Sequence, residues 1–199
     1  MRRRDNCAIR FNPAFLLSAA FALVLLPLKW LFTWGFAILV HEVCHIICIK
    51  AMKQRILAIT FDGAGAIIEA EPMLPLKELI CALAGPIGAL LLLLFSTQFP
   101  MLAICALIQS AFNLLPYYPL DGGRALYNLI LILSDEMRAA QVTKCVSFIV
   151  IILLLVFSLI MQIQYRCGIV PMCLTILLFF KSNKCNYSLQ TAQSNSTIY

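Results

Sequence analysis

Two histidines close together are the first feature of this chain that could carry chemistry. They are the only histidines in the sequence, and they lie in the run His41-Glu42-Val43-Cys44-His45. Residues i and i+4 share one face of a helix, so both imidazoles can reach a single metal ion. The glutamate beside the first histidine can then act on a water activated by that ion. The run predicts a zinc hydrolase site, and the alternative is a histidine pair that hydrogen bonds inside a helix bundle.

The third ligand of such a site has to come from elsewhere in the chain. Catalytic zinc needs three protein ligands and an open position for water, and without a third histidine the last ligand must be a carboxylate or a thiolate. Residues 113–124 read Asn-Leu-Leu-Pro-Tyr-Tyr-Pro-Leu-Asp-Gly-Gly-Arg and cannot continue a regular helix. Broken backbone at membrane depth is tolerated where it is buried or lines a wet cavity. Asp121 in this break is the candidate ligand, and the alternative is that it caps the helix that follows.

The composition places this candidate site in a membrane. Of 199 residues, 62% are hydrophobic and only 12% are charged, which is about half the charged fraction of a soluble domain. We therefore predict an all-α polytopic membrane protein with about six transmembrane helices. One core is expected over residues 1–180, followed by a short polar cytoplasmic tail at 181–199. The predicted spans are 13–28, 31–49, 79–95, 101–115, 146–161 and 169–180, with a further helix at 124–133.

Charged residues indicate how these spans are oriented. Basic residues gather before the first span, which is expected to stay uncleaved, in the loops after the second and fourth spans, and in the tail. This pattern predicts a multi-pass protein of the cell membrane with both termini in the cytoplasm. The basic residues form no patch with interleaved aromatic side chains, so no nucleic-acid partner is expected. Among the acidic residues, only Glu42 lies clearly within a span and Asp121 directly follows one, and ionisable groups at that depth are usually functional.

The cysteines do not suggest a disulfide framework. There are nine, none has C-x-x-C spacing, and most lie in apolar spans, where cysteine behaves as a small hydrophobe. We expect them to be reduced and structural. Cys44 lies inside the histidine motif but points away from the face that His41 and His45 share, so it is not a predicted ligand.

Taken together, the motifs resemble the site-2 protease family of intramembrane zinc metalloproteases. The resemblance rests on H-E-x-x-H in one span and N-x-x-P-x-x-P-L-D-G-G-R near the end of a later one. Between them, Ala84-Gly85-Pro86-Ile87-Gly88 is similar to the A-G-P segment of the third span in that family. The resemblance covers roughly residues 30–135. The small residues of the A-G-P segment either contact substrate or permit close helix packing.

The resemblance implies a role for each motif residue. It implies that zinc is bound by His41, His45 and Asp121. It also implies that Glu42 is the general base, which takes a proton from a zinc-activated water and passes it to the leaving amine. Asn113 would orient the substrate or stabilise the oxyanion, and its alternative role is a capping or bundle hydrogen bond. The substrate-binding residues implied are Asn113, Pro116, Gly65 and Gly85.

Within that family, the subgroup of the stage IV sporulation protein FB is the most similar. That subgroup has a compact six-span core without a PDZ domain, and its best-known member cleaves a membrane-associated sigma-factor precursor. The resemblance implies regulated intramembrane proteolysis near the cytoplasmic face. The substrate would be a membrane-tethered regulator, such as a sigma-factor precursor or an anti-sigma factor, and an inhibitory membrane-protein partner is plausible. The chain departs from the subgroup in its tail at 181–199, which is too short for a CBS domain, and in Cys44, where a small residue is usual.

Residues 56–71 carry a hairpin signal, because two β-prone runs flank Asp62-Gly63-Ala64-Gly65. In the family this segment is a membrane-associated β-hairpin. Its edge can pair with an extended substrate strand, since proteolysis requires an unwound helix. The alternative is a plain connector.

Two other functions compete with the protease. A metal transporter or sensor would need polar residues along a path through the bilayer, whereas the charged groups within these spans converge on one site. A catalytically inactive scaffold would most simply lack the glutamate or one of the metal ligands. This hypothesis is disfavoured because all four residues are present: His41, Glu42, His45 and Asp121.

Overall fold

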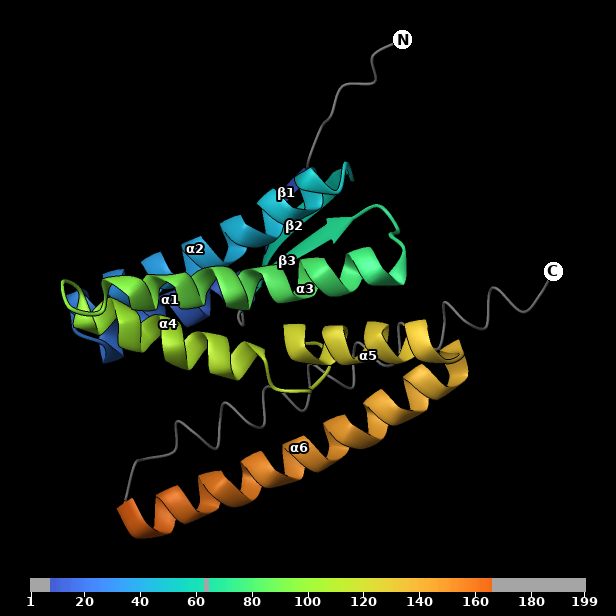
Figure 1. The fold of residues 1–199 in the computed structure, drawn as a ribbon. Helices are drawn as coiled ribbons and strands as arrows, with labels where there is room; N and C mark the ends of the chain where they lie inside the picture. The colour runs from blue at the N-terminus through green and yellow to red at the C-terminus, as the bar shows by residue number, and fades with distance from the viewer. Residues whose placement is uncertain (1–7, 63–64, 166–199) are drawn as a thin grey trace. The chain divides into compact units, whose positions relative to one another are not determined.

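The computed structural model describes residues 8–62 and 65–165 (Figure 1). The predicted sixth span at 169–180 and the polar tail at 181–199 lie outside the described residues. The chain divides into two compact units, Met1–Leu114 and Leu115–Tyr199. The predicted fold class is confirmed, because the described residues are mostly helical and include one small sheet.

Four α-helices lie in the described residues of the first unit. They are α1 (Pro13–Leu25), α2 (Leu28–Ala51), α3 (Pro75–Leu90, continued by the 3-10 helix η1 at Leu91–Phe95) and α4 (Pro100–Asn113). Proline stands in the first turn of both α3 and α4, where its missing N–H costs no helical hydrogen bond. In Figure 1, α2, α3 and α4 lie side by side, and each packs against the other two.

The core where these three helices meet is built from small residues. Ala37 of α2 is buried against Cys105 and Ala106 of α4, with Trp34 packed on the cluster. The hydroxyl of Ser110 in α4 donates a hydrogen bond of 3.1 Å to the carbonyl of Pro86 in α3. Small interface residues let helix backbones approach closely, which is how apolar helices associate when lipid offers no hydrophobic driving force.

The sheet has three strands, β1 (Ala8–Phe11), β2 (Ile56–Asp62) and β3 (Gly65–Ala70), in the order β1-β2-β3. The predicted hairpin is confirmed, because β2 and β3 pair antiparallel with Asp62 opposite Gly65. The first strand was not predicted. It pairs parallel to β2, with Phe11 opposite Phe61, and α1 and α2 form the crossover that parallel strands require.

Aromatic and polar contacts hold β1 against β2. The rings of Phe11 and Phe61 stack with their centroids 5.1 Å apart. Just beyond the strand, the amide of Asn12 donates a hydrogen bond of 3.0 Å to the carboxylate of Asp62. Because β1 covers one side of β2, the open edges of this sheet, among the described residues, are those of β1 and β3.

The second unit contains α5 (Asp121–Leu133) and α6 (Glu136–Tyr165), which pack against each other. The predicted helix at 124–133 is present and begins three residues earlier. Helix α6 begins ten residues before the predicted span at 146–161. The prediction began later because residues 136–145 include several charged and polar side chains, which lower the hydropathy of this stretch. Good helix formers in this stretch extend the helix toward its N-terminus.

Three helices in the described part of the chain are long and apolar enough to cross a membrane. They are Leu28–Ala51, Pro75–Phe95 and Glu136–Gln164, while Phe15–Val24 and Pro100–Asn113 are shorter apolar helices. The first and fourth predicted spans are therefore helical but short for a full crossing.

Candidate metal centre

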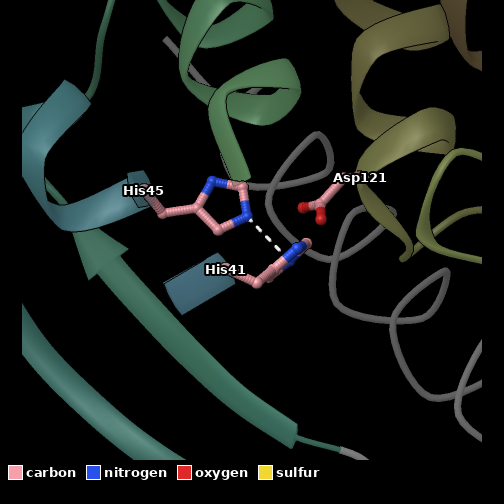
Figure 2. Close-up of side chains that lie close together, drawn as sticks. All are labelled: His41, His45 and Asp121. Atoms are coloured by element: carbon pink, nitrogen blue, oxygen red, sulfur yellow. Dashed lines mark hydrogen bonds between the residues drawn. The ribbon is translucent and has the colours of Figure 1, made fainter. Parts of the chain in front are cut away.

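The two histidines of the motif lie in the middle of a buried stripe on α2. Every fourth residue of this face is buried, and His41 and His45 are 3% and 6% exposed. Their Nε2 atoms are 3.2 Å apart, and the rings meet edge to face at 83° with centroids separated by 4.7 Å (Figure 2). The predicted i, i+4 arrangement thus brings two imidazole nitrogens to one point inside the first unit.

The second ring nitrogen of His45 determines which nitrogen is available to a metal. Its Nδ1 lies 2.8 Å from the backbone carbonyl of Cys81 in α3. A carbonyl only accepts hydrogen bonds, so Nδ1 carries a proton. When the ring is neutral, Nε2 is then the nitrogen that presents a lone pair to a metal. Histidines that ligate metals are commonly oriented in this way by a carbonyl behind the ring.

The spacing of the two nitrogens fits a zinc ion. Zinc–nitrogen bonds of 2.0–2.1 Å at a tetrahedral angle place two ligand nitrogens about 3.3–3.4 Å apart. The observed 3.2 Å between the Nε2 atoms is close to that value. Neutral imidazole is also one of the donors that zinc prefers. His41 and His45 therefore suit zinc in donor type and in spacing.

Glu42 follows His41 directly on α2 and is half-buried. As predicted, Glu42 belongs to a helix that is long and apolar enough to cross a membrane. Cys44 is also half-buried, and it packs toward Gly88 of α3 rather than toward the imidazoles. This position agrees with its exclusion from the predicted ligands.

Gly85 on α3 faces the ring of His45. A Cβ built at this glycine would overlap the imidazole, and one built at Gly88 would overlap the sulfur of Cys44. The contact favours the packing interpretation of the A-G-P segment, in which the absent side chains let α3 lie against the histidine helix. A substrate-binding role for Gly85 stays a prediction.

We expect Gly85→Ala to destabilise the protein and weaken zinc binding, because the new methyl group displaces the ring of His45. Overpacking of this kind costs about 1–3 kcal/mol. Thermal unfolding in detergent and zinc content per chain measure the two effects. The matched control is Gly35→Ala on α2, where an added Cβ meets nothing within 4 Å. Equal behaviour of the two variants would contradict the assigned contact.

Asp121 is the first residue of α5 in the second unit and is 9% exposed. Leu120 occupies the N-cap position of α5. The ligand role of Asp121 stays a prediction. One carboxylate oxygen lies 3.8 Å from the guanidinium of Arg124, one helical turn along. The side chain is labelled in Figure 2.

The backbone before Asp121 folds back against the start of α5. A Cβ at Gly123 would overlap the backbone of Tyr117 and Tyr118, so only glycine allows this approach. Tyr117 is 1% exposed, and the N–H of Tyr118 donates a hydrogen bond of 3.0 Å to the hydroxyl of Ser147 in α6. The D-G-G-R sequence thus positions its carboxylate within the second unit.

The remaining predicted residues lie at the ends of elements or between them. Asn113 is the last residue of α4, Gly65 is the first of β3 with φ of 127°, and Pro116 lies between α4 and α5. Two contacts of the site were not predicted, those of Arg124 with Asp121 and of the Cys81 carbonyl with His45. Arg124 could have been found from its i, i+3 spacing to Asp121, whereas a backbone carbonyl such as that of Cys81 leaves no mark on the sequence.

Two comparisons with known proteins found similarities. Residues 80–157 match the protein family described as Peptidase family M50, a segment that includes Asp121 and excludes His41 and His45. The structure is similar to the site-2 protease from Methanocaldococcus jannaschii, with a TM-score of 0.68 and 18% sequence identity over 94% of each chain. At that identity the likeness establishes the fold. No curated protein matches the chain.

Proposed function

We propose that this chain is an intramembrane zinc metalloendopeptidase of the site-2 protease type. The observation that carries the proposal is the buried pair of histidines, whose Nε2 atoms converge within 3.2 Å on a helix long enough to span a membrane. The peptidase family match over residues 80–157 and the shared fold support the same conclusion.

In this proposal His41 and His45 of the first unit and Asp121 of the second unit bind the metal. Three protein ligands leave the fourth position open, as catalytic zinc sites require. A zinc ion held there supplies Lewis-acid chemistry, polarising the peptide carbonyl and making water a stronger acid.

The chain's own residues move the protons in this scheme. Glu42 takes a proton from the attacking water and returns it to the leaving amine. The carbonyl of Cys81 holds the imidazole of His45 in its ligating tautomer throughout. Arg124 lies beside Asp121 and opposes rotation of that carboxylate away from its position.

The substrate in this proposal is a membrane-tethered regulatory protein, such as a sigma-factor precursor or an anti-sigma factor. The substrate is cut near the cytoplasmic face. In this proposal the protease is a multi-pass protein with both termini in the cytoplasm, and an inhibitory membrane partner controls its activity. The outer edge of β3, beginning at Gly65, offers backbone groups to an unwound segment. Asn113, Pro116 and Gly85 complete the substrate site.

Zinc removal tests the proposed function. The chain, purified and reconstituted in liposomes, should cut a single-span peptide that has a helix-breaking Asn-Pro pair in its span. Cleavage should stop after treatment with a zinc chelator and return on addition of one equivalent of zinc. An Asn113→Ala variant in this assay should raise KM if that residue orients substrate.

Two outcomes would contradict the proposal. Cleavage that survives complete removal of the metal would exclude a metalloprotease. Zinc entry into liposomes that carry a zinc-sensitive dye, without cleavage, would instead establish the competing transport function.

A further inference from the structure

Two cysteine side chains meet between α2 and α3, one helical turn from His45. Cys48 follows His45 by three residues on α2, and its sulfur lies 3.3 Å from that of Cys81 on α3. Both side chains are thiols in this structure. Cys81 is 2% exposed, whereas Cys48 is half-buried and the more accessible of the two.

The same residue that meets Cys48 through its sulfur also orients the histidine through its backbone. The carbonyl of Cys81 accepts the hydrogen bond from Nδ1 of His45 at 2.8 Å. One turn further along α3, Gly85 lies against the ring of His45, so the two helices are in direct contact here. A change in the position of Cys81 is therefore transmitted to His45.

We propose that Cys48 and Cys81 form a reversible disulfide that joins α2 to α3 and weakens metal binding at His45. A disulfide requires the sulfurs to approach to about 2.05 Å, more than 1 Å closer than the thiols lie. That movement draws the Cys81 segment toward Cys48 and disturbs the hydrogen bond to His45. The part of this proposal that concerns the metal rests on the proposed function, and the cross-link itself does not.

The oxidant in this reaction is a small peroxide, which reaches the more accessible sulfur first. Cys48 loses its proton, and its thiolate attacks a peroxide oxygen to give a sulfenic acid and displace hydroxide when the oxidant is hydrogen peroxide. The hydroxide takes up the proton lost by Cys48 and leaves as the first water. The thiol of Cys81 then attacks the sulfenic sulfur and displaces hydroxide, which takes the thiol proton and leaves as the second water. Two thiols are oxidised by two electrons, one peroxide is reduced to two waters, and a dithiol reverses the bond by exchange.

The test combines a mass measurement with a zinc titration on the full chain in detergent. After treatment with hydrogen peroxide and alkylation of the remaining thiols, we expect a peptide pair joined through Cys48 and Cys81, two hydrogens lighter than its separate parts. Competition with a chromophoric chelator should show zinc affinity lowered about 10–100-fold, the range found when a partner behind a ligand is lost. Dithiothreitol should restore it.

Matched variants separate this pair from the other cysteines. Cys48→Ser should abolish both the cross-link and the effect of peroxide on zinc affinity. Cys145→Ser removes an exposed thiol of α6 and should leave both unchanged. Cys44→Ser, which shares a proteolytic peptide with Cys48, should retain the cross-link and so assign it.

Each contrary result has its own meaning. No cross-link under conditions that oxidise Cys145 would overturn the disulfide. A complete cross-link with unchanged zinc affinity would overturn its control of the metal centre. Failure of the reduced wild type to bind zinc would overturn that control together with the proposed function, while the mass of the peptide pair would still decide the disulfide.

Discussion

Replacement of Glu42 by glutamine is expected to abolish peptide cleavage and leave zinc in place. Glutamine has nearly the same shape, but its amide cannot take a proton from water. General acid–base groups typically contribute about 10²–10⁴-fold to a rate, so the loss should be at least a hundredfold. The histidines that flank Glu42 in the motif keep their Nε2 atoms 3.2 Å apart and retain the ion.

Cleavage rate and zinc content per chain are measured together for this variant. Glu136→Gln is the matched control, since Glu136 is an exposed glutamate at the start of α6, and it should behave as wild type. Wild-type cleavage by the Glu42 variant would refute the proposed base. Loss of zinc together with activity would instead make Glu42 a ligand.

Asp121→Ala should remove most of the zinc. The substitution deletes the proposed oxygen ligand and leaves two imidazoles where a catalytic zinc site needs three protein ligands. We expect a loss of affinity beyond the ~10–100-fold that follows removal of a group behind a ligand. Cleavage should fall with the zinc, because both proposed activities of the ion depend on its being held.

The control for this variant is Asp135→Ala. Asp135 is an exposed carboxylate in the same unit, between α5 and α6, and its contact of 3.4 Å is with Arg138. Its removal should not change zinc content. If the Asp121 variant retained a full equivalent of zinc, the third ligand would lie elsewhere, and the second unit would lose its proposed part in the centre.

What the sequence could predict depends on how local the determining interaction is. His41 and His45 are related by helical periodicity alone, so their spacing was enough to pair them. The hairpin at 56–71 was readable for the same reason, because its turn residues lie between the two runs that pair.

Long-range interactions were the ones that the sequence concealed. β1 has only four residues, and it is stabilised by a strand some fifty positions later. The contact of Gly85 with the ring of His45 depends on which side chain α3 meets, and no local pattern encodes that. The sequence identified Asp121 as an unusual carboxylate within a break in the helical pattern. Its role as a metal ligand stays a proposal, which the zinc content of the Asp121→Ala variant tests.

The parallel pairing of β1 with β2 has a consequence for the order of events during synthesis. β1 leaves the ribosome before α1 and α2, whereas β2 leaves it after both. The parallel ladder between β1 and β2 can therefore form only after both helices have been synthesised.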